Sequence, residues 1–229
     1  MRNVRILTLL ALVAMIPMNA GADPIAVGEI VKFSDRPGNT GGGEFNLVDT
    51  SNLSEWIITF CLQKTEYMNF TNDFIVGSIN DYTLTDPADK GGVGGMDPLS
   101  SQTAWLYTQF YNGTLANYVY GFEGNAAFAN REASANALQH AFWGFENEET
   151  LDMNNFYVQL ALNNTPADFE IGRVGVLNLY LYDKTKPGGL GAEAQDQLTM
   201  RVPEPSTLAL LGAGLLGVCV RRRRQQNKA

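Results

Sequence analysis

Apolar and polar residues alternate between Val174 and Tyr182 with the period of a β-strand. Successive side chains of a strand point to opposite faces, so one face of this strand is expected to carry Leu177, Leu179 and Leu181. The opposite face is expected to carry Val174, Val176, Asn178, Tyr180 and Tyr182. Glu55–Leu62, rich in aromatic and β-branched residues, predicts a second strand. Further strands are expected over 26–33 and 44–48, as a hairpin, within 69–84, and over 195–202.

The centre of the chain has the period of helices instead. Ser100 can cap a helix that Asn112-Gly113 ends. A second helix is expected over 125–145 and a short third one over 152–162. Strands followed by helices and again by strands predict an α+β fold, mainly an antiparallel β-sheet or sandwich with a central two- to three-helix insertion.

An apolar run near the N-terminus has the pattern of a secretory signal. Arg2 and Arg5 precede the apolar segment Ile6–Ile16, and Ala20-Gly21-Ala22 gives the small-x-small pattern that signal peptidase cleaves. Residues 1–22 are therefore predicted to be a signal peptide that signal peptidase removes after Ala22.

A second apolar run, Leu208–Val220, carries no charge and predicts a short C-terminal transmembrane helix. Arg221–Arg224 follow it, and because positive flanks stay cytoplasmic, residues 225–229 are expected to form a polar cytoplasmic tail. The exported α+β domain is then expected to span 23–201, with a sorting segment over 202–224.

Pro203-Glu204-Pro205 stands directly before this helix, and the two prolines favour an extended, accessible backbone. The ordered combination resembles the PEP-CTERM sorting signal of Gram-negative bacteria. An ordinary tail anchor would explain the helix and the arginines but not the Pro-Glu-Pro. The resemblance implies an inner-membrane intermediate, cleavage by an exosortase, and delivery to the cell surface or extracellular matrix.

The charge of the body is strongly acidic. All 24 Asp and Glu lie between Asp23 and Glu204, together with only 9 of the 16 Lys and Arg, a formal balance of −15. Such a field repels nucleic acid, which is therefore not expected as a partner. It also keeps an extracellular protein soluble.

Cys61 is the only cysteine of the predicted body, because Cys219 belongs to the C-terminal helix. The body can form no internal disulfide, and an unpaired thiol in an oxidising compartment is expected to be buried, covalently occupied or reactive. One cysteine and the single histidine, His140, offer no zinc site, and the acidic residues around the loop 86–96 do not have EF-hand spacing. No metal or cofactor is expected.

Three short patterns resemble, in order, the signatures of the surface thioester domains of bacterial adhesins. They are Phe60-Cys61-Leu62, Ser101-Gln102-Thr103-Ala104-Trp105-Leu106 and Leu138-Gln139-His140-Ala141-Phe142-Trp143. The resemblance implies that Cys61 is the thiol, Gln139 the acyl donor and Gln102 a supporting residue. It also implies an adhesin that reacts once with an amine or hydroxyl of its target, for example an exopolysaccharide, and is not an enzyme. His140 adjoins Gln139 and is a candidate general acid or base.

Two other functions use the same residues differently. A matrix or carbohydrate-binding protein would need no covalent chemistry, and its tyrosines and tryptophans could stack on sugar rings. A Cys61–His140 dyad, with Asn155 or Asp168 orienting the imidazole, would instead make a cysteine peptidase. The strand-like surroundings of Cys61 lack the helix start that usually activates a catalytic thiol.

Overall fold

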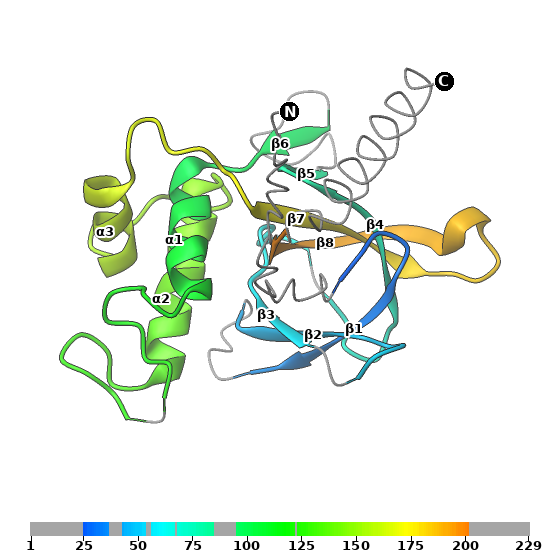
Figure 1. Cartoon of the computed structure of the whole chain (residues 1–229), viewed down its shortest axis with the longest axis horizontal. Coiled ribbons are helices and arrows are strands. Elements are labelled where there is room, and N and C mark those ends of the chain that lie inside the picture. Colours follow the sequence, from blue (N-terminus) through cyan, green and yellow to red (C-terminus); the bar gives the residue numbers. More distant parts are fainter. Residues whose placement is uncertain are drawn as a thin grey trace, which may run out of the picture. The chain divides into compact units, whose positions relative to one another are not determined.

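The computed structural model describes residues 25–36, 43–53, 56–66, 68–84, 95–121 and 123–201. The described strands are β1 (Ile30–Asp35), β2 (Phe45–Asp49), β3 (Trp56–Thr59), β4 (Phe74–Asn80), β5 (Tyr82–Leu84), β6 (Met96–Pro98), β7 (Val174–Tyr182) and β8 (Leu190–Met200). The helices α1 (Ser101–Tyr111), α2 (Arg131–Phe145) and α3 (Phe156–Asn164) lie between β6 and β7, and a 3₁₀ turn, η1 (Pro187–Gly189), precedes β8. Figure 1 shows the three helices together on one side of the strands.

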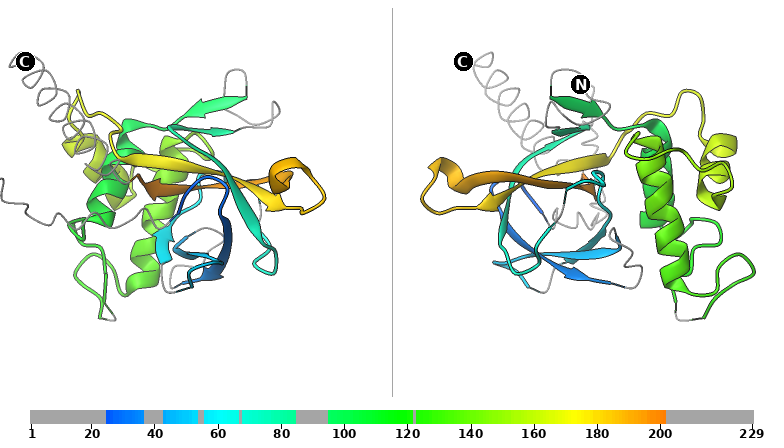
Figure 2. Two further views of the ribbon diagram at one scale, coloured as in Figure 1. Left: turned by 45° about the vertical axis from the view of Figure 1, so that its right-hand side comes forward. Right: turned by 180° about the vertical axis from the view of Figure 1, so that it is seen from behind.

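Six antiparallel strands form one sheet in the order β3-β2-β1-β4-β7-β8, and β5 pairs with β6 beside it. The two outer strands of this order also meet. Just after β3, Cys61 forms an antiparallel bridge with Gln197 of β8. The backbone N–H of Leu62 donates to the Asp196 carbonyl and that of Leu198 to the Phe60 carbonyl, each at 3.0 Å. The sheet therefore closes into a small barrel, whose curvature is visible from two directions in Figure 2.

The interior of the barrel is one of two hydrophobic cores. Alternate residues of the strands supply it, and Trp143 enters from α2. Its buried members are Ile25, Val31, Phe33, Phe45, Leu47, Ile57, Cys61, Phe74, Val76, Trp143, Leu177, Leu179 and Ala194.

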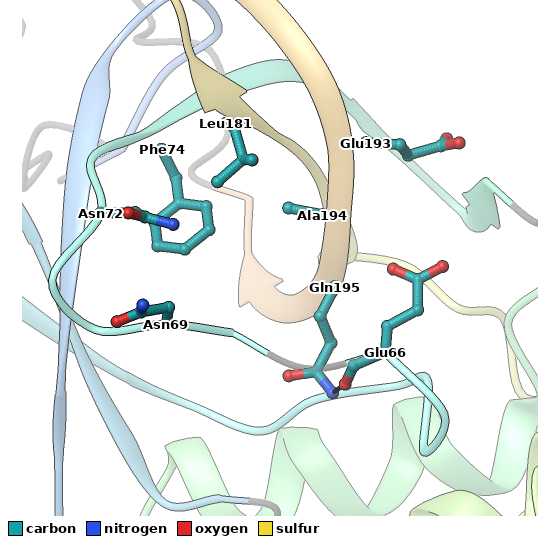
Figure 3. A pocket seen from close by; sticks show the side chains of 8 residues that line it. All are labelled: Glu66, Asn69, Asn72, Phe74, Leu181, Glu193, Ala194 and Gln195. Carbon is teal, nitrogen blue, oxygen red and sulfur yellow. Dashed lines mark hydrogen bonds between the residues drawn. The ribbon is translucent and has the colours of Figure 1, made fainter.

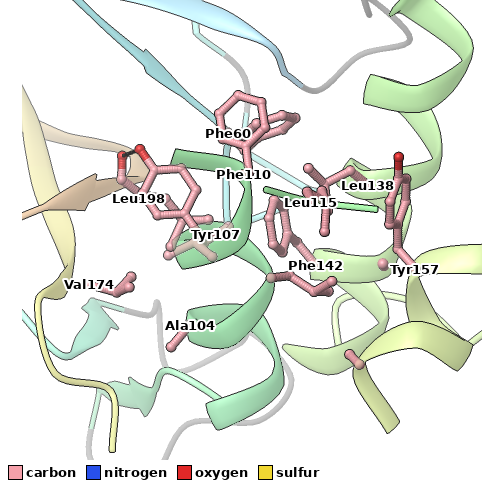
Figure 4. Close-up of a cluster of buried hydrophobic side chains, with 14 of the residues drawn as sticks. Phe60, Ala104, Tyr107, Phe110, Leu115, Leu138, Phe142, Tyr157, Val174 and Leu198 are labelled. Atoms are coloured by element: carbon pink, nitrogen blue, oxygen red, sulfur yellow. Dashed lines mark hydrogen bonds between the residues drawn. The ribbon is translucent and has the colours of Figure 1, made fainter. Parts of the chain in front are cut away.

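The second core lies between the outer face of the barrel and the helices (Figure 4). Phe60 packs edge-on against Phe110 of α1 and Phe142 of α2, with ring centroids 5.1 and 5.3 Å apart. Tyr107 of α1 donates its hydroxyl to the Ile58 carbonyl at 2.9 Å, so a polar contact also ties the helices to the barrel wall.

The predicted α+β class, the antiparallel sheet and the three-helix insertion are confirmed. The main sheet is closed rather than stacked as a sandwich. The alternation predicted for β7 is confirmed in its central part. Val174 and Val176 pack in the helix-side core, whereas Leu177 and Leu179 pack inside the barrel.

Helix ends follow the side chains that cap them. The Ser100 side chain accepts a hydrogen bond from the Thr103 amide, and α1 ends at Asn112, as predicted. The predicted start of the second helix at 125 was wrong, because the Asn125 side chain holds a turn and Asn130 caps α2. The third helix likewise begins later than predicted, after its cap Asn155.

In the part of the chain described above, no helix is long and apolar enough to cross a membrane. The predicted signal peptide, the transmembrane helix and Pro203-Glu204-Pro205 lie outside the described residues.

A buried carboxylate ties the β1–β2 hairpin to the start of α2. Glu44 has a fully buried side chain and accepts from Arg131 Nε and Nη2, both at 2.8 Å. Arg36 lies 3.6 Å from the same carboxylate, and Tyr118 donates its hydroxyl to it. One group from the hairpin thus fixes two segments of the helical layer.

Removing Glu44 should therefore be costly. Glu44→Ala leaves the Arg131 guanidinium without its buried partner, and we expect the free energy of unfolding to fall by about 3–5 kcal/mol, measured by urea denaturation. Lys32→Ala is the control, because the Lys32–Asp73 pair at 3.1 Å is half exposed and its loss should cost at most about 1 kcal/mol. Equal losses in the two variants would contradict this.

A second buried carboxylate joins the end of α2 to the start of α1. Glu146 accepts from the Ser100 hydroxyl at 2.7 Å and lies 3.3 Å from the Ser100 amide. Burial raises the pKa of Glu146 from 4.5 to about 7, the Ser100 and Thr103 side chains and the Ser100 amide act in the opposite direction, and the charge of Asp97 adds to the increase. The folded state therefore holds this proton more tightly than the unfolded state.

Stability should consequently decrease as the pH rises through this range. The contribution of Glu146 is full below about pH 4.5 and is lost by about pH 7, on the order of 3 kcal/mol in all. We expect the free energy of unfolding to drop more for the wild type than for Glu146→Gln between about pH 5 and pH 8. Burial also raises the pKa of Asp196, but that group is present in both proteins and cancels in the difference. Parallel pH profiles would refute the assignment.

Candidate thiol and carboxamide site

Cys61 sits where the barrel closes. Its neighbours Phe60 and Leu62 are both hydrogen-bonded to β8, so the backbone on either side of the thiol is fixed. Phe60 and Leu62 pack toward the helices, whereas Cys61 belongs to the barrel core. This alternation turns the thiol inward, and its side chain is completely buried.

Gln139 reaches the same place from α2. Leu138 and Phe142, one helical turn apart, pack in the helix-side core. Gln139 and Trp143 have the same spacing on an adjacent stripe of the helix. Gln139 contacts Cys61, and Trp143 packs in the barrel core. The helix thus inserts one carboxamide and one indole beside the thiol.

The thiol and the carboxamide touch at two points. Cys61 Sγ lies 3.6 Å from Gln139 Oε1, and Gln139 Nε2 donates to the Cys61 carbonyl at 2.7 Å. The second bond fixes the plane of the amide. The sulfur faces the carboxamide oxygen in this arrangement, and attack requires it to move to within about 3–3.5 Å of the carbonyl carbon. Both side chains are fully buried.

The surroundings disfavour a free thiolate. Burial raises the pKa of the Cys61 thiol well above its ordinary value, the Trp143 side chain acts in the opposite direction, and the charge of Glu148 adds to the increase. The sulfur is therefore protonated in the folded protein, unless it is held in a bond that carries no charge.

A cluster of charged side chains covers Trp143 from the solvent side. Lys64 Nζ lies 2.6 Å from Glu149 Oε2 and 5.3 Å from the centre of the Trp143 ring. His140 Nδ1 lies 2.8 Å from Glu149 Oε1, and its ring meets Trp143 edge-on. The Lys64 amide also donates to Glu148 at 2.9 Å. These contacts join the segment after Cys61 to the turn after α2.

The other predicted residues make their hydrogen bonds with groups other than the thiol and the Gln139 carboxamide. Gln102 is half-buried in the first turn of α1, where its Oε1 accepts from the Ser101 hydroxyl. No hydrogen bond links it or His140 to Cys61 or Gln139 among the residues that the structure describes. Asn155 caps α3 and donates to the Ala137 carbonyl instead of orienting the imidazole. The geometry therefore gives no support to a Cys61–His140 dyad.

Sequence reasoning missed two neighbours of the thiol. Gln197, whose backbone pairs with Cys61, places a second buried carboxamide near the thiol, and only the closure of the barrel brings it there. Trp143 was expected only as the last residue of the third pattern and as a ring that could stack on sugars, although its position four residues after Gln139 on a helix indicates a shared face. The Lys64–Glu149–His140 cluster also depends on contacts that no local pattern encodes.

A hollow of about 240 Å³ lies beside β8. Figure 3 shows its lining of two carboxylates, three carboxamides and three apolar side chains: Glu66, Asn69, Asn72, Phe74, Leu181, Glu193, Ala194 and Gln195. Two contacts connect this hollow to the thiol. Gln195, which lines the hollow, accepts at Oε1 from Gln197 Nε2 at 3.3 Å, and the backbone of Gln197 pairs with Cys61.

The described residues give no support to metal ligation, and they exclude three aromatic rings, though not that of the half-exposed Tyr111, from sugar stacking. They contain no group of three or more His, Cys, Asp or Glu placed to hold a metal ion, and Asp86 and Asp89 lie outside them. Tyr107, Tyr118 and Trp143 are buried in the two cores and cannot present a ring face to a sugar.

Comparison with known proteins assigns the C-terminal segment. The family model of the PEP-CTERM protein-sorting motif matches residues 201–224, which include Pro203, Glu204 and Pro205. The prediction of this motif is confirmed, and it supports an exported protein that exosortase processes at the membrane on its way to the cell surface. No match was found among curated proteins or solved structures, so the resemblance of the body to thioester domains gains no support from them.

The charged cover should act as a local latch. Lys64→Ala removes the cation shared by Glu149 and the Trp143 ring, and an exposed pair of this kind contributes at most about 1 kcal/mol. We expect backbone amides in 62–66 and 146–149 to exchange hydrogen up to about fivefold faster, measured by mass spectrometry. Lys32→Ala, which breaks a comparable exposed pair on the barrel, should leave both segments unchanged. Unaltered exchange in Lys64→Ala would rule out the latch.

Proposed function

We propose that this protein is a surface adhesin whose exported body forms an internal thioester between Cys61 and Gln139. The bond is stored until a target amine or hydroxyl attacks it, for example on an exopolysaccharide. The protein then reacts once and stays attached, so it is a covalent binder rather than an enzyme with turnover.

One observation carries the proposal. The thiol of Cys61 and the carboxamide of Gln139 come from distant parts of the sequence and meet at 3.6 Å in full burial, with the amide held by the Cys61 carbonyl. A buried cysteine that served only to fill space would need no such partner.

The chemistry balances within these two side chains. The sulfur attacks the Gln139 carbonyl carbon, the carbon–nitrogen bond breaks, and the amide nitrogen leaves as ammonia with the thiol proton. Later the target nucleophile attacks the same carbon. The carbon–sulfur bond then breaks, an amide or ester joins the target to Gln139, and the proton of the nucleophile returns to Cys61.

The surroundings of Cys61 favour the thioester over the free thiol. A thioester carries no charge, so the apolar barrel core that disfavours the thiolate does not disfavour it. Complete burial also keeps water from the acyl carbon, which protects the bond from hydrolysis. Lys64, Glu149 and His140 form the cover on the solvent side of Trp143, and we assign to His140 a proton exchange with the arriving target rather than with the sulfur.

Sorting and adhesion fit together. The PEP-CTERM motif supports delivery to the cell surface, where a bound target is pulled by flow and a covalent link resists that force. We assign the earlier steps to signal peptidase, acting after Ala22, and to an inner-membrane intermediate held by the helix within 202–224.

A carbohydrate-binding or matrix protein without covalent chemistry is the second candidate. The hollow beside β8 favours it, because the carboxamides of Asn69 and Asn72 that line it can hydrogen-bond sugar hydroxyls. This candidate leaves both Cys61 and Gln139 chemically unchanged.

Intact-mass spectrometry of the exported protein separates the two candidates. We expect the wild type to be lighter than its sequence mass by one ammonia and to gain one methylamine on incubation, as the acyl carbon is released from sulfur. Cys61→Ala and Gln139→Ala should show the full mass of their sequences and no reaction.

Gln197→Ala is the matched control, since it removes the other buried carboxamide near Cys61 and should keep the mass deficit. A wild-type protein of full mass, with an alkylatable Cys61 thiol and no uptake of methylamine, would refute the thioester.

A further inference from the structure

Trp143 has a buried polar group without an obvious role. The side chain is 2 % exposed, and its indole Nε1 has no hydrogen-bond partner within the described ranges. A buried donor left without an acceptor costs about 1–3 kcal/mol, so its retention calls for an explanation, and a catalytic role is one of the few available. The rest of the indole is well accommodated, because it packs in the barrel core beside Cys61.

The orphan N–H and the thiol belong to the same buried core. Trp143 and Gln139 are one helical turn apart on α2, and Gln139 contacts the sulfur. The Trp143 side chain lowers the pKa of the Cys61 thiol against the effect of burial. Nε1 makes no hydrogen bond with any described residue in the thiol form, so it is free to donate to the sulfur. A donor placed in this way is of most use when the sulfur becomes charged.

We propose that Trp143 is a catalytic residue of the thioester chemistry, in which its indole N–H stabilises the negative charge that develops on Cys61 Sγ. This inference rests on the proposed function. Trp143 thereby supplies in an apolar core the one donor that a transient thiolate needs.

The same N–H serves both directions of the reaction. During formation, the sulfur gives up its proton as it attacks the Gln139 carbonyl carbon, and ammonia leaves. During opening, an amine attacks that carbon and the carbon–sulfur bond breaks with its electron pair on sulfur. The N–H donates to the resulting thiolate until a proton from the amine converts it to the thiol. No oxidant or further reactant is needed.

The other hydrogen-bond donors near the sulfur already have acceptors. Gln139 Nε2 is engaged by the Cys61 carbonyl, and Gln197 Nε2 lies 3.3 Å from Gln195 Oε1 and 3.9 Å from Met68 Sδ. His140 and Lys64 both pair with Glu149 on the solvent side of the indole. Trp143 is thus the buried donor without another acceptor at this place in the described structure.

The test is Trp143→Phe in the full chain, which keeps an aromatic ring and removes the N–H. A hydrogen bond to a charged group contributes about 1.5–3 kcal/mol, so methylamine uptake should slow by about tenfold or more. Trp105→Phe, in a half-buried indole of α1, should react at the wild-type rate. Thermal unfolding of both variants checks that the fold is retained. Uptake in Trp143→Phe at or above the wild-type rate overturns the proposal.

A second readout does not depend on the thioester. In Gln139→Ala, where the thiol is free, the indole N–H resonance of Trp143 is identified by its loss in Trp143→Phe. Adding Cys61→Ala should shift this resonance upfield and speed its hydrogen exchange, because the sulfur acceptor is gone. An unchanged resonance overturns the contact. A wild type of full mass would overturn the proposed function and the catalytic role with it, whereas a mass deficit with an unchanged resonance would overturn the role of Trp143 alone.

Discussion

The pairing of the segment after β3 with β8 is the constraint on which the rest of the structure depends. It joins the two outer strands of the sheet and leaves the closed barrel no free edge along this seam. It also decides which way three consecutive side chains point. Phe60 and Leu62 face the helices and build the core that holds them, while Cys61 faces inward. The anchoring of the helical layer and the burial of the thiol therefore both follow from the register in which the segment after β3 pairs with β8.

The helical layer must in turn present Gln139 to that thiol with little freedom. Its position on α2 is set from both ends of the helix, by Glu44 with Arg131 at the start and by Glu146 with Ser100 at the end. Both carboxylates are buried, and such pairs specify geometry more than they add stability. A carboxamide held by several remote contacts meets the sulfur in one arrangement, which is what condensation of two uncharged groups requires.

Local patterns in the sequence were enough to predict those features that depend only on side chains within the same strand or helix. The faces of β7 follow from its alternation, and the start of α1 follows from Ser100. The start of α2 was misplaced because Asn125 and Asn130 are both plausible caps, and Asn125 instead holds a turn. Barrel closure, Gln197 beside the thiol and the cover over Trp143 depend on residues far apart in the chain, so no local signal could reveal them. The meeting of Cys61 with Gln139 was expected only through a resemblance to other proteins.

The way in which α2 is held has a mechanical consequence for the proposed adhesin. Once the target has reacted, it is tethered to Gln139 and no longer to Cys61, so tension enters the molecule through the middle of α2. From there the load divides, through Glu44 into the β1–β2 hairpin and through Glu146 into α1. The strain is shared between barrel and helices instead of peeling one strand from the edge of a sheet, which is the weaker way to load a β-structure.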